Sequence, residues 1–175
     1  MNAFRSERLL YRQPVLNDAE DIFEGWSSDR EATQWMGWKR HESLEDTHDF
    51  INMGSAKWSE DGVGPFLIES QEDGAVVGSS GLTLVEPGVV ELGYIYARPY
   101  WGKGFAGETI QAMVDFAREN DFERVIARVH EDNLASAYLL GKYGFSAPKS
   151  PLVRGQCPNL DSQDYIQLDY EIRLS

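Results

Sequence analysis

Cysteine and long apolar runs are scarce in this chain. Its one cysteine, Cys157, excludes an internal disulfide, so we expect a protein of the reducing cytoplasm. No stretch approaches the roughly 20 apolar residues that a membrane-spanning helix requires. The first eight residues also lack the apolar core of a secretory signal. We therefore expect neither secretion nor a membrane partner, and no metal site.

Positive charge is scarce too, because 16 Lys and Arg stand against 29 Asp and Glu and leave a net charge of −13. Binding of nucleic acid needs a cationic surface that displaces counterions, so we expect no nucleic acid partner. Such acidity would attract a basic substrate. It would also simply keep the protein soluble, and we favour this explanation because the acidic residues are spread along the whole chain.

The chain does have the composition of a folded domain. Hydrophobic residues make up 42% and aromatic residues 12% of its 175 residues, enough for a substantial core. No repeat, low-complexity tract or long linker divides the sequence. We therefore expect one domain that spans residues 1–175.

Hydrophobic periodicity predicts an α+β fold, with helices first, an antiparallel sheet next, and helices alternating with strands at the end. Three early helices are expected to be capped by Asn17, Ser28 and Ser43. Two later helices are predicted over 108–120 and 133–143, the second closed by Gly144. The predicted strands cover residues 9–12, 65–69, 75–85, 89–96, 123–129 and 164–174.

The most informative segment is Tyr100–Gly107, which reads Tyr-Trp-Gly-Lys-Gly-Phe-Ala-Gly and joins a predicted strand to a predicted helix. A glycine-rich turn at this position leaves backbone N–H groups unpaired, and the positive end of the helix dipole adds to their attraction for anions. This arrangement suits a phosphate or a pyrophosphate. The alternative is a tight turn whose glycines let the helix and the strand pack closely.

Gly102, Gly104 and Gly107 also spell the Gly-x-Gly-x-x-Gly of a dinucleotide site. A dinucleotide site places this motif in a β-α-β unit at the start of a parallel sheet. Here the motif lies past residue 100, after a predicted antiparallel meander. A nicotinamide-dependent oxidoreductase is therefore the weaker hypothesis.

A second segment, Asn133–Phe145, favours phosphate binding by the glycine-rich turn over a purely structural turn or a dinucleotide site. Trp101–Ala106 fits the Gln/Arg-x-x-Gly-x-Gly/Ala loop with which GNAT-superfamily N-acetyltransferases hold the pyrophosphate of coenzyme A, except that Trp101 replaces Gln or Arg. The later family signature, Asn-x-x-Ser/Ala and then Lys-x-Gly-Phe, is matched by Asn133, Ser136, Lys142, Gly144 and Phe145. The chain therefore resembles the GNAT superfamily.

Four further motifs narrow this resemblance: Arg8–Arg12, Trp35–Trp38, Leu92–Tyr94 and Tyr100–Gly104. They are similar to those of bacterial ribosomal-protein N-terminal acetyltransferases, the RimJ/RimL-like group. The resemblance implies a GNAT fold, with a mixed, mostly antiparallel central sheet of about seven strands that is flanked by helices and splayed near its middle.

The resemblance also implies acetyl transfer from acetyl-CoA to an amine. The fourth strand would bind the pantetheine arm through its main chain, the glycine-rich loop would bind the pyrophosphate, and the later signature would add side-chain contacts. A catalytically weak module that binds acyl-CoA for regulation is the alternative, because Trp101 and Leu140 depart from the family pattern. The implied cofactor-binding residues are Tyr94, Ile95, Tyr96, Trp101, Gly102, Lys103, Gly104, Phe105, Ala106, Gly107, Asn133 and Lys142.

A base must take the proton of the attacking amine. Glu91 is the first candidate, because it lies on the strand beside the cofactor, where relatives often carry a glutamate. Strand alternation puts it on the face opposite Tyr94. Glu86 and His130 are the reserve candidates, and a solvent-facing Glu91 is the plain alternative.

An acid would protonate the departing thiolate. Many relatives use a tyrosine at the position that Leu140 occupies here. Ser136 and then Tyr138 are the substitutes, and a thiolate could also leave without an acid. Cys157 is not expected to carry the acyl group, because no histidine is near it in sequence.

In the family, the early helices and the loop between the last two strands help to build the acceptor pocket. Trp35, Met36, Trp38 and residues 150–163 would line it here. The net charge of −13 motivates a basic peptide N-terminus or a polyamine as the amine substrate. The sequence leaves the oligomeric state open, a homodimer included.

Overall fold

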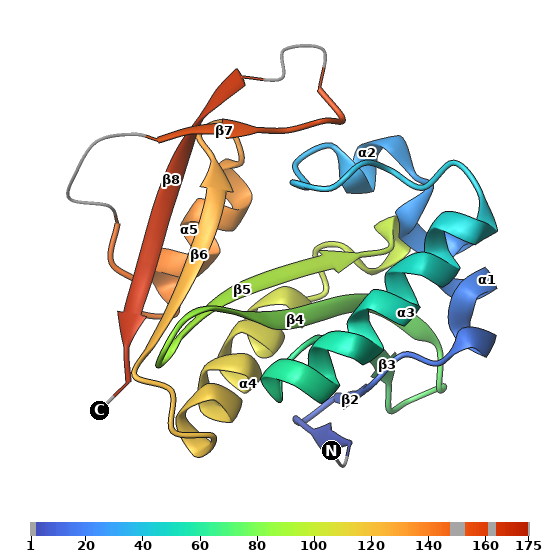
Figure 1. Cartoon of the computed structure of the whole chain (residues 1–175), viewed down its shortest axis with the longest axis horizontal. Coiled ribbons are helices and arrows are strands. Elements are labelled where there is room, and N and C mark those ends of the chain that lie inside the picture. The colour runs from blue at the N-terminus through green and yellow to red at the C-terminus, as the bar shows by residue number, and fades with distance from the viewer. Residues whose placement is uncertain (1–2, 148–152, 161–163, 175) are drawn as a thin grey trace.

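One twisted sheet forms the centre of the molecule. A computed structural model describes residues 3–147, 153–160 and 164–174. The strand order is β1-β2-β3-β4-β5-β6-β8-β7, and every neighbouring pair is antiparallel except β5 and β6 (Figure 1). The strands are β1 (Phe4–Arg5), β2 (Leu9–Arg12), β3 (Pro65–Ser70), β4 (Val76–Glu86), β5 (Val89–Tyr96), β6 (Arg124–His130), β7 (Val153–Gln156) and β8 (Asp164–Arg173).

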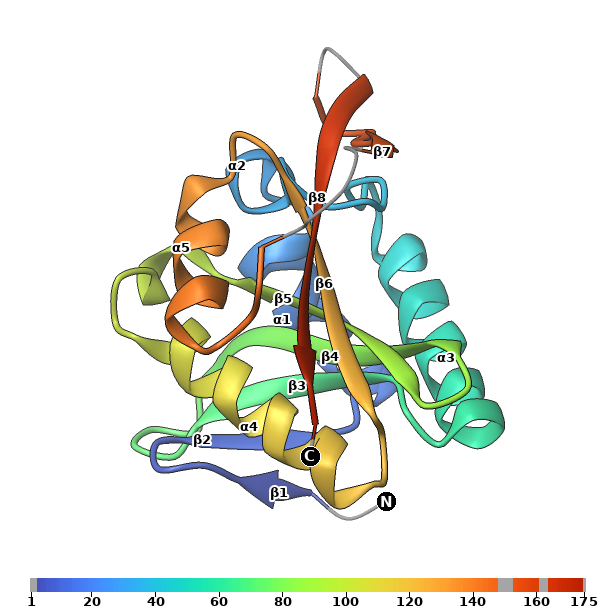
Figure 2. The ribbon, with the colours of Figure 1, turned by 90° about the vertical axis from the view of Figure 1, so that its left-hand side faces the viewer.

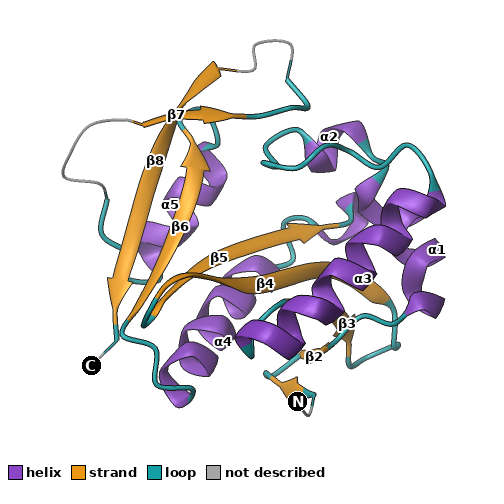
Figure 3. Ribbon diagram, in the orientation of Figure 1, coloured by secondary structure: helices purple, strands orange, loops and turns teal. Residues whose placement is uncertain are grey.

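The parallel pair is short. β5 and β6 are joined over three residue pairs, from Val89–Arg124 to Glu91–Ile126. Beyond Glu91 the two strands diverge, and β6 and β8 rise away from β4 and β5 (Figure 3). The mixed sheet with a central splay is therefore confirmed. The short strands β1 and β7 were not predicted.

Helices cover both faces of this sheet (Figure 2). On one face lie α4 and α5, and on the other lie α1, the π-helical turn η2 and α3. The helices are η1 (Leu16–Asp18), α1 (Ala19–Ile22), η2 (Phe23–Ser27), α2 (Arg30–Thr33), α3 (Leu44–Asp61), η3 (Arg98–Tyr100), α4 (Phe105–Glu119) and α5 (Leu134–Lys142). Within the described residues, no helix is long and apolar enough to cross a membrane.

Strand alternation gives each face its own core. On β5, Val90, Leu92 and Tyr96 join the larger cluster beneath α4, whereas Ile95 joins the cluster beneath α1 and α3. Glu91 and Gly93 share the face of Ile95, which confirms that Glu91 and Tyr94 lie on opposite sides of the sheet.

Two of the predicted helix caps are wrong, and both errors have a local cause. Asn17 lies inside η1, and the carboxylate of Asp18 instead accepts the Val15 N–H at 2.7 Å while it pairs with Arg12. The cap of α2 is Asp29, one residue after Ser28. Ser28 is occupied otherwise, because its hydroxyl bonds Phe23 O at 2.6 Å.

Other boundaries follow the prediction more closely. Ser43 caps α3 and forms a capping box with Asp46. Asn133 caps α5, and Gly144 follows its last turn with a φ of +88°. α4 begins at Phe105, three residues before the predicted start at Glu108, so the glycine-rich turn leads directly into the helix.

Candidate functional site

The turn between β5 and α4 presents free backbone donors. Gly102 and Gly104 have φ values of +75° and +82°, which favour glycine. In the described part of the chain, no protein group accepts a hydrogen bond from the N–H groups of residues 102–107, whereas the next amide, Glu108 N, bonds Gly104 O at 3.2 Å. The start of α4 adds its dipole to these free N–H groups, so the turn is suited to an anion.

Gly107 has a different reason to be glycine. A Cβ at this position would lie 2.4 Å from the Tyr143 hydroxyl, so its absence lets α4 pack against the end of α5. Positive φ angles therefore favour glycine at Gly102 and Gly104, whereas close packing requires it at Gly107.

A cavity of about 490 Å³ opens beside this turn, and we call it the glycine-turn cavity. Its walls come from β5, α5, the start of α4 and the segment from Glu31 to Met36. It brings together nearly all the predicted cofactor residues: Tyr94, Ile95, Tyr96, Trp101, Gly102, Gly104, Phe105, Ala106, Gly107, Asn133 and Lys142, with Ser136 beside them.

The main chain of β5 faces this cavity at alternate residues. In an antiparallel pair, residues that bond the partner strand alternate with residues whose N–H and C=O groups point away. Ala97 N donates to Val77 O at 3.0 Å, so Ala97 and Ile95 bond β4, whereas the main-chain groups of Tyr94 and Tyr96 point into the gap left by β6. The expectation that Ile95 offers its main chain is therefore corrected, although Ile95 is among the residues that line the cavity.

Trp101 has a role that the sequence did not suggest. Its indole Nε1 donates to the carbonyl of Tyr96 at 2.8 Å, although the side chain is 46% exposed. This bond ties the turn to the end of β5. It also uses one of the outward-pointing carbonyls of the strand, and Tyr94 keeps both of its groups for a ligand.

α5 carries the polar groups on the far wall. Asn133 Oδ1 accepts from Ser136 N at 3.2 Å, and Ser136 Oγ hydrogen bonds the Tyr94 hydroxyl at 2.7 Å. Burial raises the pKa of Tyr94, and the bond to Ser136 opposes this only in part. The Tyr94 phenol therefore stays protonated near neutral pH and, with Ser136, forms a hydroxyl pair that can deliver a proton.

Several candidates do not reach the cavity. Tyr138 is 71% exposed and lines neither this cavity nor the next. Lys103 stacks its Nζ over the Tyr100 ring at 4.8 Å. Glu86 pairs with Arg124 at 2.7 Å near the end of β4, and His130 packs against Trp35 with its Nδ1 accepting from Asp132 N.

A second cavity, of about 320 Å³, lies on the opposite face of β4 and β5, and we call it the α3 cavity. Its walls come from η2, α3, both strands and the segment around Met36 to His41. Met36, Tyr94 and Ile95 line both cavities. The two cavities are therefore neighbours that share these residues beside the splay of the sheet.

Glu91 lines the α3 cavity, where its carboxylate pairs with Arg128 at 2.6 Å. Burial raises the pKa of Glu91, Arg128 opposes that rise, and Asp169 adds to it. The net effect is a raised pKa. Glu91 is thus a stronger base than an ordinary surface glutamate, on the side of β5 away from the glycine turn.

The segment that joins the two cavities is held from the other end of the chain. Asn159 Nδ2 donates to Thr33 O and Trp38 O at 2.8 and 2.9 Å, and its Oδ1 accepts from Arg40 N at 2.8 Å. Trp38 lines the α3 cavity as expected. Trp35 was predicted there but lines the glycine-turn cavity instead. Residues 150–152 and 161–163 of the predicted acceptor loop lie outside the described residues.

Cys157 belongs to the same support. Its thiol bonds Gln34 O at 2.9 Å, it is buried, and it lines neither cavity. Burial raises the pKa of the Cys157 thiol, which disfavours the nucleophilic thiolate. These observations agree with a structural thiol.

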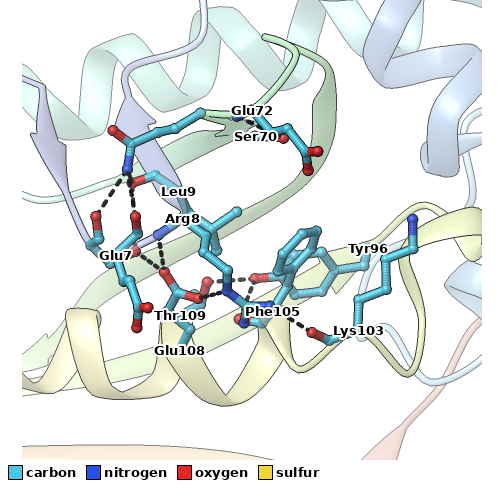
Figure 4. A network of polar contacts seen from close by, with 12 residues as sticks. Glu7, Arg8, Leu9, Ser70, Glu72, Tyr96, Lys103, Phe105, Glu108 and Thr109 are labelled. Carbon is cyan, nitrogen blue, oxygen red and sulfur yellow. Dashed lines mark hydrogen bonds and ion pairs between the residues drawn. The ribbon is translucent and has the colours of Figure 1, made fainter.

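A polar network that the sequence did not reveal anchors the turn to β2 (Figure 4). Glu108, in the first turn of α4, accepts from Ser6 and from Arg8 N and Nε, the last two at 2.7 and 2.8 Å. Arg8 Nη1 donates to Lys103 O at 3.0 Å, and the guanidinium stacks 4.8 Å from the Phe105 ring. Arg8 therefore holds the turn from behind and neutralises a carboxylate close to the free amides.

Comparison with known proteins identifies relatives of the same kind. Residues 8–146 match the family described as acetyltransferase (GNAT) domain. The uncharacterized N-acetyltransferase p20 of Bacillus licheniformis is 32% identical over 148 residues, which are 83% of each chain.

Solved structures show the same fold. A GNAT-family acetyltransferase from Bacillus anthracis superposes with a TM-score of 0.83 at 22% identity and covers 98% of each chain. The ribosomal L7/L12 acetyltransferase RimL, solved in complex with coenzyme A, gives a TM-score of 0.82 at 18% identity over 99% of this chain and 98% of its own.

Proposed function

The chain belongs to the GNAT family of acetyltransferases, and on this premise we propose that it moves the acetyl group of acetyl-CoA to a primary amine by direct attack in a ternary complex. One observation carries the proposal. The glycine-turn cavity and the α3 cavity approach β5 from opposite faces and share Met36, Tyr94 and Ile95. A thioester in one cavity and an amine in the other would meet there without a covalent carrier.

The donor side fits the glycine-turn cavity. The free amides of residues 102–107 would hold the pyrophosphate of coenzyme A, and the α4 dipole would favour its charge. The main-chain groups of Tyr94 would bond the pantetheine arm in the gap left by β6. Lys142 lines the same cavity and would add a cation near the phosphates.

The proton steps fall to residues on opposite faces of β5. Glu91 would take the proton of the incoming ammonium, directly or through one water, which frees the lone pair for attack on the thioester carbon. As the C–S bond breaks, the Tyr94–Ser136 hydroxyl pair would deliver a proton to the departing sulfur. The catalytic residues of this proposal are Glu91, Ser136 and Tyr94, and Tyr138 is left out because it points to solvent.

A regulatory module that binds acyl-CoA without turnover would share the donor site but would not need the second cavity. The base-bearing α3 cavity, open to the same point on β5, favours the enzyme. Cys157 is the one cysteine and no disulfide is required, so we place the enzyme in the cytoplasm.

An Ala106→Asp substitution tests the donor site. Ala106 lines the glycine-turn cavity in the first turn of α4, where a carboxylate stabilises a helix. The same charge would repel the pyrophosphate. We expect the melting temperature to change little, because the helix dipole opposes the cost of placing a charge at this half-buried position. The acetyl-CoA affinity, measured by isothermal titration calorimetry, should fall about a hundredfold or more.

The control is Gln111→Glu, which adds the same charge on an exposed part of α4 outside the cavity. It should keep full affinity. Equal affinity in the Ala106→Asp protein would refute the donor site. Binding without acetyl transfer to any member of a broad amine panel would favour the regulatory module.

A further inference from the structure

The wall of the α3 cavity is largely apolar and aromatic. Away from the sheet, its hydrophobic lining comes from α1, η2, α3 and the segment before α3, and includes Ile22, Trp26, Met36, Trp38, Phe50 and Met53. The His41 ring packs between Trp38 and Phe50, with ring centroids 5.2 and 6.0 Å away. Met53 at the edge is 62% exposed, so the apolar surface continues to the mouth of the cavity. A hollow of this kind favours an apolar occupant.

The Asp and Glu residues of the chain are not concentrated in the α3 cavity. Glu91 is the one acidic residue among those that line the cavity, and it is paired with Arg128. The exposed Lys57 brings a positive charge to the rim. His41 is buried, hydrogen bonds Thr47 at 2.8 Å, and has its pKa lowered by burial against the opposing charge of Asp46, so it is neutral near pH 7. Among the described residues, the lining holds no second carboxylate for a second ammonium group.

One polar atom in the wall has no partner. Ser27, the last residue of η2, is 1% exposed, and its Oγ has no hydrogen bond within the described part of the chain. Ser27 lines the α3 cavity, and its carbonyl accepts from His41 N at 3.0 Å, which fixes its backbone. A buried hydroxyl of this kind usually has a partner. The accessible area of Ser27 Oγ is below 1 Å², so a ligand group in the cavity would reach it only if the Ser27 side chain turns toward the cavity.

We propose that the acceptor is a primary amine attached to a large, uncharged, apolar group, and that a polar atom of this group hydrogen bonds Ser27 Oγ. The inference rests on the proposed acetyl transfer and names its substrate class. It replaces the basic peptide or polyamine that the net charge suggested. A second ammonium group would lose its hydration in this cavity and, beyond Glu91, find no carboxylate among the described lining residues.

Two sources could supply such an amine: a free arylalkylamine, or a peptide that begins with an aromatic or large aliphatic residue. The panel therefore contains phenethylamine, tyramine, Phe-Gly-Gly, Ser-Gly-Gly and spermidine, assayed by thiol release from acetyl-CoA. We expect kcat/KM for the better of phenethylamine and Phe-Gly-Gly to exceed that for Ser-Gly-Gly and spermidine by about tenfold to a hundredfold, because an aromatic group is buried. The ratio between phenethylamine and Phe-Gly-Gly identifies the source.

A preference for spermidine would mean that the aromatic wall attracts a cation, and it would overturn the proposed class. A preference for Ser-Gly-Gly would overturn it too. Both outcomes would leave acetyl transfer itself intact. If calorimetry shows no binding of acetyl-CoA, the proposed acetyl transfer itself is refuted. The failure of the substrate class and the failure of the proposed function therefore give different results.

Ser27→Ala tests the polar contact. It removes a hydroxyl that has no protein partner, so we expect an unchanged or higher melting temperature. At the same time KM for the preferred acceptor should rise about fivefold to tenfold, with the acetyl-CoA Kd unchanged. The matched control is Ser28→Ala, because Ser28 lies next to it but bonds Phe23 O and lines neither cavity.

The control should show the reverse pattern, a lower melting temperature with an unchanged acceptor KM. If Ser27→Ala lowers the melting temperature and leaves every KM unaltered, the hydroxyl is structural and the contact does not exist. A readout without turnover uses Trp26 and Trp38, whose fluorescence should change when phenethyl alcohol is added to the protein saturated with coenzyme A. Spermine at the same concentration should leave it unchanged, and the opposite result would contradict the proposal.

Discussion

Glu91 lies between influences that move its pKa in opposite directions. Burial and Asp169 raise it, Arg128 lowers it, and the balance leaves it raised. Its side chain is 27% exposed, so a water or an amine can reach it. A carboxylate with these properties can accept a proton near neutral pH and lose that ability as the medium becomes acidic.

We predict that Glu91→Gln lowers kcat by about a hundredfold, in the range of a lost general base. The acetyl-CoA Kd should stay the same, because Glu91 does not line the glycine-turn cavity. The acidic limb of the wild-type pH profile, which the raised pKa of Glu91 shifts upward, should disappear. Glu86→Gln is the control, since it also breaks an ion pair with an arginine but lies outside both cavities. A fully active Glu91→Gln enzyme with an unaltered pH profile would remove Glu91 from the mechanism.

The glycine-rich turn could be predicted at the residue level because its signal is local. Positive φ angles, free amides and a helix start all follow from eight consecutive residues. The role of Trp101 could not be predicted in this way, because its bond to Tyr96 O depends on how the turn folds back on β5. Ser27 could not be singled out for a similar reason, because only the tertiary structure shows that its hydroxyl lacks a hydrogen-bond partner in the described part of the chain.

At the scale of elements, α4 begins in an unusual electrostatic setting. Its first amides have no acceptor within the described part of the chain, and the carboxylate of Glu108 lies in the same turn. Burial alone would raise the pKa of Glu108, but hydrogen bonds from Ser6 and Arg8 outweigh burial and lower it. The helix thus keeps the stabilising acid of its first turn, with the charge directed toward β2.

We predict that Glu108→Gln lowers the free energy of unfolding at pH 7 by about 1–2 kcal/mol, through weaker bonds to Ser6 and Arg8. Because the pKa of Glu108 is lowered in the folded state, its contribution is present above the pKa of an unfolded glutamate and is lost as the pH falls through the folded value. Urea unfolding should therefore separate mutant and wild type at pH 7 but much less at about pH 3.

The control for this experiment is Glu119→Gln, at the exposed C-terminal end of the same helix. It should be neutral or slightly stabilising, since a carboxylate is unfavourable at that end. A constant difference between Glu108→Gln and wild type from pH 7 to pH 3 would show that packing, and not charge, accounts for the loss.

Some elements could be read from the chain and others could not. β5 and the caps at Ser43 and Asn133 were predicted because their hydrophobic alternation and capping side chains are local. The caps of the first two helices were wrong, because nearby aspartates, Asp18 and Asp29, complete them while pairing with Arg12 and Arg98. β7 was not predicted, because a strand of four residues is too short to show a clear hydrophobic alternation.

At the scale of the whole molecule, the net charge does not describe the lining of the α3 cavity. The charge of −13 is a sum over the chain, whereas the α3 cavity contains one paired carboxylate. That cavity is assembled from η2, α3, β4 and β5, which lie far apart in sequence. No local sequence pattern predicts such a site, and its lining residues can be identified only from the folded structure.

Asn159 connects distant parts of the molecule. Through Thr33, Trp38 and Arg40 it holds the segment that lines both cavities. We predict that Asn159→Ala raises KM for both acetyl-CoA and the acceptor about threefold to tenfold, because the segment must then be ordered on binding. Amide hydrogen exchange in residues 33–40 should become faster.

Asn120→Ala serves as the control, because Asn120 also bonds a main-chain carbonyl but lies at the end of α4, away from both cavities. It should change neither the exchange of residues 33–40 nor the two KM values. Unaltered exchange in the Asn159→Ala protein would mean that the segment is held by its other contacts.

The divergence of β5 from β6 leaves a strand edge of β5 unpaired inside the sheet. In most proteins, unpaired strand edges occur only at the outer edges of a sheet. Filling that edge would complete the hydrogen bonding of the sheet. The acetyl donor would then be a structural component as well as a reagent, and the protein would gain rigidity each time it is loaded. Each release of product would lower that rigidity again. Turnover and conformational stability would therefore be coupled through the gap between β5 and β6.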